Sequence, residues 1–165
     1  MKKFGLWAFF ALLLFIVQVT VLPFFPLHGV TGDLLLLLAA SYGFLKGRRL
    51  GVLAGFFLGL CHDLATGTFF GIHTFVDMTV GLCCGKFSDQ VFKDQFFLPL
   101  TASVFATSVA YFVPLAFVFM MGYEFDAAAH MRNNLPAMLI LEFLLACPVH
   151  KLTLKADAYI REQTR

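Results

Sequence analysis

The sequence predicts an all-α integral membrane protein whose single domain, residues 1–165, crosses the bilayer six times. Hydrophobic residues make up 60% of the chain and charged residues only 13%, whereas soluble domains have roughly 45–50% and 25%. The apolar residues fall into six stretches, and the basic residues fall almost entirely on one side of a six-span arrangement. No loop between the stretches is long enough to form a soluble domain.

Six stretches have the composition of membrane-spanning helices, because crossing a hydrocarbon core of about 30 Å takes roughly 20 largely apolar residues. They are residues 4–22, 30–45, 50–66, 70–85, 96–121 and 134–149. The second is short, and Asp33 near its start is typical of a helix cap, so we expect its neighbours to shield it. Pro114 is expected to kink the fifth helix, which is long enough to span with tilt.

Lysine and arginine predict the orientation. Eleven of the 12 lie at the termini or in the loops after the second and fourth spans, and only Arg132 lies on the other side. Because cytoplasmic loops carry the positive excess, both termini are predicted to be cytoplasmic. Lys2 and Lys3 before an apolar stretch are also typical of a signal peptide, but residues 18–30 contain no A-x-A-like cleavage site, so we expect an uncleaved first span.

Glycine recurs at intervals of four along the third and fourth spans. Residues four apart share one face of a helix, so these glycines predict an antiparallel hairpin with closely approaching backbones. The residues assigned to helix packing are Gly51, Gly55, Gly59, Gly67, Gly71, Gly81 and Gly85. The same spacing places Asp63 and His73 near each other at the outer end of the hairpin.

Five ionisable residues are candidates for a partner site or pocket: Asp63, His62, His73, Asp77 and Glu142. A carboxylate in hydrocarbon costs several kcal/mol unless it is paired or hydrated, so the three carboxyls should face the bundle interior. Packing alone is the main interpretation of the hairpin. A proton relay is an alternative, and a metal site is another, although no closed ligand motif is present and we therefore expect no metal.

The remaining polar residues and cysteines predict no further chemistry. Gln18 in the first span, and Ser103, Thr107 and Tyr111 in the fifth, are expected to form interhelical hydrogen bonds. The cysteines form no C-x-x-C pair and are read as small buried hydrophobic residues. No catalytic motif stands out, so the chain is not expected to be an enzyme or to need a cofactor, and a formal charge of +2 without a basic run excludes a nucleic-acid surface.

Several runs together resemble the rod shape-determining protein MreD family. They are Gly32-Asp33-Leu34-Leu35-Leu36, then Gly51, Gly55 and Gly59-Leu60-Cys61-His62-Asp63-Leu64, then Gly67 and Phe70-Gly71-Ile72-His73. The resemblance implies a non-enzymatic scaffold of the bacterial cell-elongation complex in the inner membrane. The implied direct partner is MreC, with the actin-like MreB, RodA and its penicillin-binding synthase as indirect partners in side-wall peptidoglycan synthesis. Membrane lipids are also expected to contact the chain.

The family is also similar in architecture to the substrate-binding S components of energy-coupling-factor transporters. The alternative function is therefore a small-molecule (vitamin) transporter subunit. Those subunits dock their energising partner through an A-x-x-x-A face, whereas Ala8 and Ala11 here are three apart among bulky neighbours. A proton-coupled carrier is a third alternative. Residues 151–165 are expected to lie on the anionic lipid surface or to touch a cytoplasmic filament.

Overall fold

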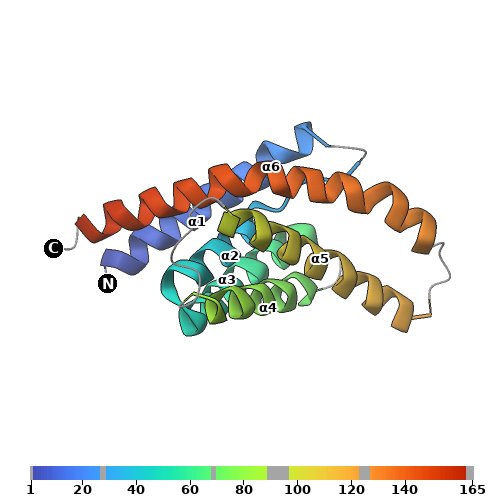
Figure 1. The fold of residues 1–165 in the computed structure, drawn as a ribbon, viewed down its shortest axis with the longest axis horizontal. Coiled ribbons are helices and arrows are strands. Elements are labelled where there is room, and N and C mark those ends of the chain that lie inside the picture. The colour runs from blue at the N-terminus through green and yellow to red at the C-terminus, as the bar shows by residue number, and fades with distance from the viewer. Residues whose placement is uncertain (1, 27–28, 68–69, 89–96, 123–126, 163–165) are drawn as a thin grey trace.

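The computed structural model describes residues 2–26, 29–67, 70–88, 97–122 and 127–162. Helices are the only secondary-structure elements longer than one residue in these ranges (Figure 1). They are α1 (Lys2–Thr20), the 3-10 helix η1 (Leu22–Phe24), α2 (Leu34–Lys46), α3 (Arg48–Thr66), α4 (Ile72–Lys86), α5 (Phe97–Met120) and α6 (Ala127–Glu162).

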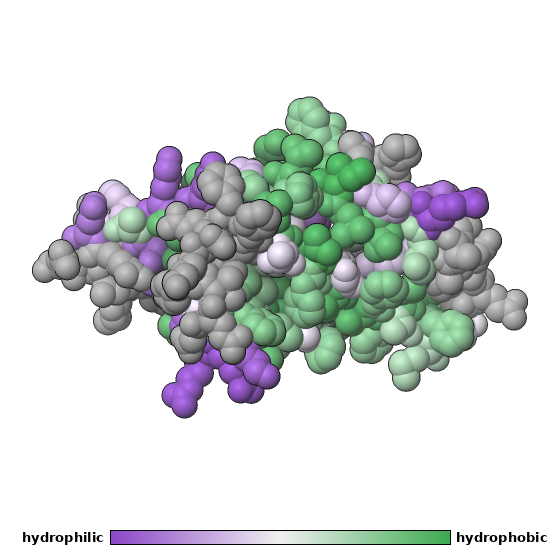
Figure 2. Space-filling model, viewed as in Figure 1, coloured by the Kyte–Doolittle hydropathy of each residue, from purple (hydrophilic) through white to green (hydrophobic). Residues whose placement is uncertain are grey.

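The predicted all-α membrane class is confirmed. Within the described residues, four segments are long and apolar enough to cross a bilayer, namely Gly5–Phe24, Arg48–Thr66, Pro99–Met120 and Met131–Ile160. The start of α1 and the end of α6 lie at the same end of the molecule in Figure 1, as an even number of crossings requires. Figure 2 shows hydrophobic atoms gathered over the middle of this face and hydrophilic atoms toward its two ends.

Helix α2 has only 13 residues and lies at the centre of the bundle. Every residue from Leu34 to Ser41 is buried, and Leu35 and Leu36 are completely inaccessible. Its leucines pack on one side against α1, α3 and α6 and on the other against α4 and α5. A helix enclosed by its neighbours does not need to match the bilayer thickness, so the shortness of α2 is compatible with its predicted place as the second span.

Glycines bring α2, α3 and α4 into backbone contact. A Cβ atom built on Gly59 would lie 2.5 Å from the Thr74 Cα atom and 2.7 Å from the carbonyl oxygen of His73. Gly55 faces the backbone of Asp77, and Gly51 and Gly81 face each other's backbones. Real Cβ atoms do not approach backbone this closely, so any side chain at these positions would separate the helices.

The row of glycines in backbone contact starts earlier along the chain, and ends earlier, than the sequence predicts. Gly43 in α2 belongs to it, because its Cβ would lie 2.7 Å from the Gly81 carbonyl oxygen. Gly67 and Gly71 do not belong to it, since a Cβ on either would meet no atom within 4 Å. They cap the ends of α3 and α4 with φ angles of +64° and +102°, which glycine adopts without steric cost.

The last helix is much longer than residues 134–149. It runs over 36 residues, and its C-terminal part buries one face, formed by His150, Thr153, Asp157 and Ile160. Lys46 at the end of α2 forms an ion pair with Asp157. The described part of the C-terminal stretch therefore packs one face against the bundle and exposes the other. The 3–4-residue spacing of the buried positions is the physical reason.

The Ser103 and Thr107 hydroxyls of α5 donate within their own helix and not to another helix as predicted. Ser103 donates to the carbonyl oxygen of Leu100, and Thr107 donates to that of Ser103 at 2.7 Å. Both acceptors belong to α5 itself. Bonding to the preceding turn satisfies a buried hydroxyl without any partner helix, and it is the commoner solution for serine and threonine inside helices.

Candidate functional site

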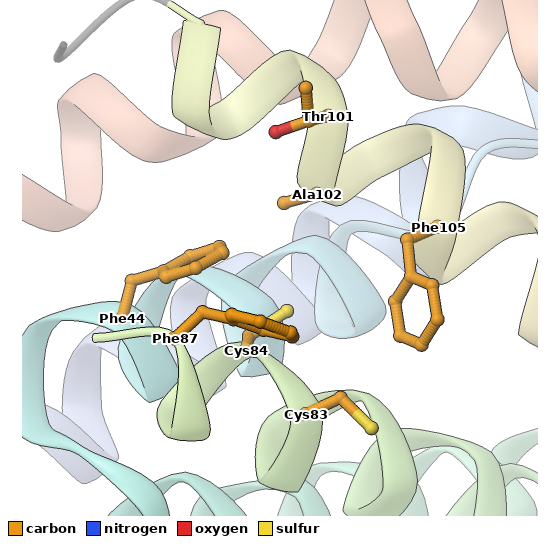
Figure 3. A pocket seen from close by; sticks show the side chains of 7 residues that line it. All are labelled: Phe44, Cys83, Cys84, Phe87, Thr101, Ala102 and Phe105. Carbon is orange, nitrogen blue, oxygen red and sulfur yellow. The ribbon is translucent and has the colours of Figure 1, made fainter. Parts of the chain in front are cut away.

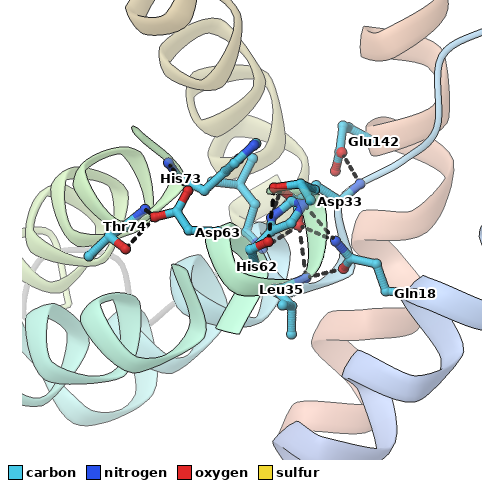
Figure 4. A network of polar contacts seen from close by, with 10 residues as sticks. Gln18, Asp33, Leu35, His62, Asp63, His73, Thr74 and Glu142 are labelled. Atoms are coloured by element: carbon cyan, nitrogen blue, oxygen red, sulfur yellow. Dashed lines mark hydrogen bonds and ion pairs between the residues drawn. The ribbon is translucent and has the colours of Figure 1, made fainter. Parts of the chain in front are cut away.

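Polar side chains from α1, α3, α4, α6 and the start of α2 converge on one region of the bundle (Figure 4). It lies where α2 and α4 begin and where α3 ends, because the antiparallel α3–α4 hairpin brings those ends together. Two groups of contacts can be separated: one centred on Asp63 and one centred on Asp33.

Asp63 caps the start of α4 from outside that helix. Its Oδ1 accepts the His73 backbone N–H at 3.0 Å, and its Oδ2 accepts the Gly71 and Thr74 backbone N–H groups, each at 3.0 Å. The Thr74 hydroxyl donates to Oδ2 at 2.6 Å. The first N–H groups of a helix have no intrahelical acceptor, and glycine at the N-cap offers no side chain, so Asp63 supplies both the acceptor and the charge. With 1% of its surface exposed, Asp63 is fully used in holding the hairpin.

Asp33 caps α2 and connects it to three other helices. Its Oδ1 accepts the backbone N–H groups of Leu35 and Leu36 at 3.1 and 3.0 Å, as expected for a helix cap. Gln18 of α1 donates its amide N–H to the same oxygen at 3.2 Å and accepts the Leu35 N–H at 2.9 Å. The backbone N–H of Asp33 donates to Oε1 of Glu142 in α6 at 2.5 Å.

The second oxygen of Asp33 faces two stacked histidines. Nδ1 of His62 lies 3.2 Å from Asp33 Oδ2. The rings of His62 and His73 stack with their centroids 3.9 Å apart and their planes 24° from parallel. One ligand atom each of Asp33, His62 and His73 can be chosen so that all three lie within 4.8 Å of one another, a spacing compatible with a shared metal ion.

Asp77 and Glu142 are both completely buried. Neither Asp77 oxygen and only one Glu142 oxygen has a hydrogen-bond partner among the described residues. Burial agrees with the expectation that intramembrane carboxyls face the bundle interior. Neither carboxyl is needed to cap a helix, so neither has the structural role found for Asp63.

The sequence located most of this region but misjudged how its members combine. Asp63, His62 and His73 do come together, as their positions at the turn of the hairpin predict. The sequence predicts only a helix cap for Asp33 and only an interhelical hydrogen bond for Gln18. In the structure each also lies beside a ring nitrogen of His62, at 3.2 Å for Asp33 and 3.4 Å for Gln18. The available signal was their shared depth: each is a polar residue at the outer end of its predicted span.

A cavity of about 310 Å³ lies between α2, α4 and α5, away from the polar region (Figure 3). Its wall contains the rings of Phe44, Phe87 and Phe105 and the thiols of Cys83 and Cys84. A lining of this kind suits hydrocarbon and offers almost no polar group to orient a soluble ligand. It therefore adds no chemistry to the site.

A comparison with protein families matches residues 1–154 to the rod shape-determining protein MreD family. No match is found among curated proteins or among solved structures. The matched range contains the whole glycine hairpin, both helix-capping aspartates and both stacked histidines, and it supports a role in determining rod shape. The chain belongs to the rod shape-determining protein MreD family.

Proposed function

We propose that this chain is a non-enzymatic scaffold of the bacterial elongation complex, seated in the inner membrane with both termini in the cytoplasm. Its direct partner in this proposal is MreC, and through MreC it supports side-wall peptidoglycan synthesis with MreB, RodA and the penicillin-binding synthase. The observation that carries the proposal is the family match over residues 1–154. The basic residues that predict the orientation support the placement of the termini.

The interior of the bundle supports a structural task. Short helix α2 is enclosed, and α3 and α4 meet backbone to backbone. The Asp63 carboxylate accepts hydrogen bonds from the α4 N-terminus, which favours a structural role for this candidate residue. Large apolar side chains are exposed on several helices, and we propose that MreC contacts this lipid-facing surface.

Site-specific photo-crosslinking in native membranes tests where MreC binds. Positions with well-exposed side chains sample four helices: Phe9 in α1 at 65%, Leu64 in α3 at 67%, Phe119 in α5 at 76% and Leu144 in α6 at 70%. We expect MreC adducts from one side of the bundle and none from the opposite side. The same crosslinking residue placed at the buried position of Val80 serves as the control.

Gentle solubilisation and affinity purification distinguish the scaffold from the transporter. Co-purification with MreC supports the scaffold, and depletion should then make rod-shaped cells round. Recovery with an energising transporter subunit and a bound vitamin, or unchanged rods with a nutrient-uptake defect, would overturn it. A fluorescent protein fused after Arg165 tests the orientation, because common fluorescent proteins fold and fluoresce in the cytoplasm. A fusion protein that inserts into the membrane without fluorescing would contradict a cytoplasmic C-terminus.

A further inference from the structure

Three potential metal ligands from three separate elements meet in the polar region. Asp33 precedes α2, His62 belongs to the last turns of α3, and His73 belongs to the first turn of α4. Asp33 and His62 are 29 residues apart in sequence, and His62 and His73 are 11 apart. The three residues therefore form no short sequence motif. We refer to these three residues as the Asp33–His62–His73 cluster (Figure 4).

The two oxygens of Asp33 have different environments, and one of them is suited to a metal. Oδ1 already accepts three hydrogen bonds, from the Leu35 N–H, the Leu36 N–H and the Gln18 amide. Oδ2 faces Nδ1 of His62 at 3.2 Å. Two ligands of a tetrahedral zinc ion with bonds of about 2.0–2.1 Å lie about 3.3 Å apart, so this pair already has the spacing of two zinc ligands.

The stacking of His73 on His62 is not explained by hydrogen bonding. The His73 backbone N–H caps onto Asp63, but no hydrogen bond of its imidazole is found among the described residues. The ring planes are 24° from parallel, and a metal ion lies in the plane of each imidazole that binds it, so the unbonded His73 ring would turn out of the stack to share an ion with His62. Two neutral imidazoles and a carboxylate form one of the common zinc ligand sets.

In the described part of the chain, the buried carboxyls around the cluster have His62 as their one ion-pair partner. No lysine or arginine in the described ranges forms an ion pair with Asp33, Asp77 or Glu142. Glu142 is completely buried next to Asp33, with one oxygen on the Asp33 N–H and the other without a partner. Buried carboxylates are costly unless paired or bound to a metal, and a divalent cation at the cluster would supply that charge.

Without an ion, Nδ1 of His62 lies 3.2 Å from Asp33 Oδ2 but has no hydrogen-bond partner among the described residues. The Gln18 amide nitrogen lies 3.4 Å from Nε2 of His62, and its orientation is fixed because Oε1 accepts the Leu35 N–H. Nε2 of His62 is then the acceptor and Nδ1 carries the proton toward Asp33. A metal ion would replace this proton, as metal ions do when they bind protonated ligands, and the proton would be released to solvent.

We propose that the Asp33–His62–His73 cluster binds one zinc ion, which ties the starts of α2 and α4 to the end of α3. This site is independent of the scaffold function and differs from the sequence-based expectation of no metal. The ion would link the three elements that the glycine contacts bring together.

The full chain, purified in detergent and stripped with a chelator, is titrated with zinc chloride by calorimetry, and bound zinc is counted by mass spectrometry. We expect about one zinc per chain and a higher unfolding temperature. His73→Ala removes a ligand whose side chain forms no hydrogen bond in the described chain, and Asp33→Asn keeps the helix cap. Each should weaken zinc binding at least about tenfold. His150→Ala is the control, because His150 bonds Ser41 and not the cluster.

Cobalt as the probe ion identifies the ligands. A tetrahedral visible spectrum without a thiolate charge-transfer band supports the cluster, whereas a thiolate band would assign the ion to cysteine, such as the exposed Cys61, and overturn the proposal. Zinc binding that is absent in the wild-type chain, or equal in the wild type, His73→Ala and Asp33→Asn, would overturn it too. The two substitutions remove ligands from different elements, so a folding defect in one leaves the other decisive.

Discussion

Removing the Asp63 carboxylate should uncouple α3 from α4. Asp63→Ala leaves the backbone N–H groups of Gly71, His73 and Thr74, and the Thr74 hydroxyl, without their acceptor. An unsatisfied buried donor costs about 1–3 kcal/mol, and the hydroxyl can rotate to another acceptor. Three stranded N–H groups therefore predict a loss of about 3–9 kcal/mol, a large part of the roughly 5–15 kcal/mol that holds a typical domain folded.

Asp63→Asn separates the number of acceptors from the charge. The amide keeps one oxygen, which can turn toward the three donors that now contact Oδ2, and its NH₂ group then faces the His73 N–H. One donor is stranded, so the expected loss is about 1–3 kcal/mol. The ranking Ala below Asn below wild type is the signature of a helix cap.

Equilibrium unfolding in mixed detergent micelles measures these losses. Thr74→Val removes one donor and should cost about 1 kcal/mol, and it should reduce the further loss caused by Asp63→Ala. Thr107→Val is the control, since Thr107 is also buried but donates within its own helix. If Asp63→Asn and Asp63→Ala both stay within about 0.5 kcal/mol of the wild type, the value typical of neutral surface changes, the capping role is refuted.

Three further perturbations test other contacts by the same unfolding assay. Gly59→Ala should destabilise by about 1–3 kcal/mol or more because its Cβ would meet backbone, whereas Gly5→Ala, with no atom within 4 Å, should be neutral; equal effects would disprove the close contact. Asp157→Asn should cost about 1 kcal/mol by leaving the Lys46 ammonium half-buried, and Lys46→Met in the same chain should recover much of it; no recovery would show that the pair is not the cause. Glu142→Leu should cost about 1–3 kcal/mol by stranding the Asp33 N–H while Glu142→Gln keeps an acceptor, so two equally stable variants would contradict that hydrogen bond.

Asp63 and His73 show how far the sequence reaches into the candidate site. Both are predicted to meet because an antiparallel hairpin of two neighbouring spans brings the end of one beside the start of the next, and they do meet. Whether Asp63 is free for a partner or consumed by a helix cap depends on which backbone N–H groups its oxygens face. Sequence spacing does not contain that information, since a rotation of α4 by one residue would change it.

Asp33 and Glu142 mark the opposite limit. They are 109 residues apart, and nothing in their local sequences pairs them. Only the packing of α6 against the start of α2 places a carboxylate on the Asp33 N–H. Packing also accounts for the length of the last helix, which continues beyond residue 149 and is held to α2 by the ion pair of Asp157 with Lys46.

The sequence by itself determined that the chain is a membrane protein, that it is helical, and approximately where five of the helices end. Hydropathy, basic residues and glycine spacing are local features, which can be read from neighbouring residues. The sequence also determined that α3 and α4 form a close hairpin, since four-residue spacing repeats on one helix face. Tertiary structure alone decided that α2 is enclosed and that Asp33, His62 and His73 form one cluster. Those features depend on contacts between distant segments, whose geometry is set by how six helices pack and not by the residues adjacent to each group.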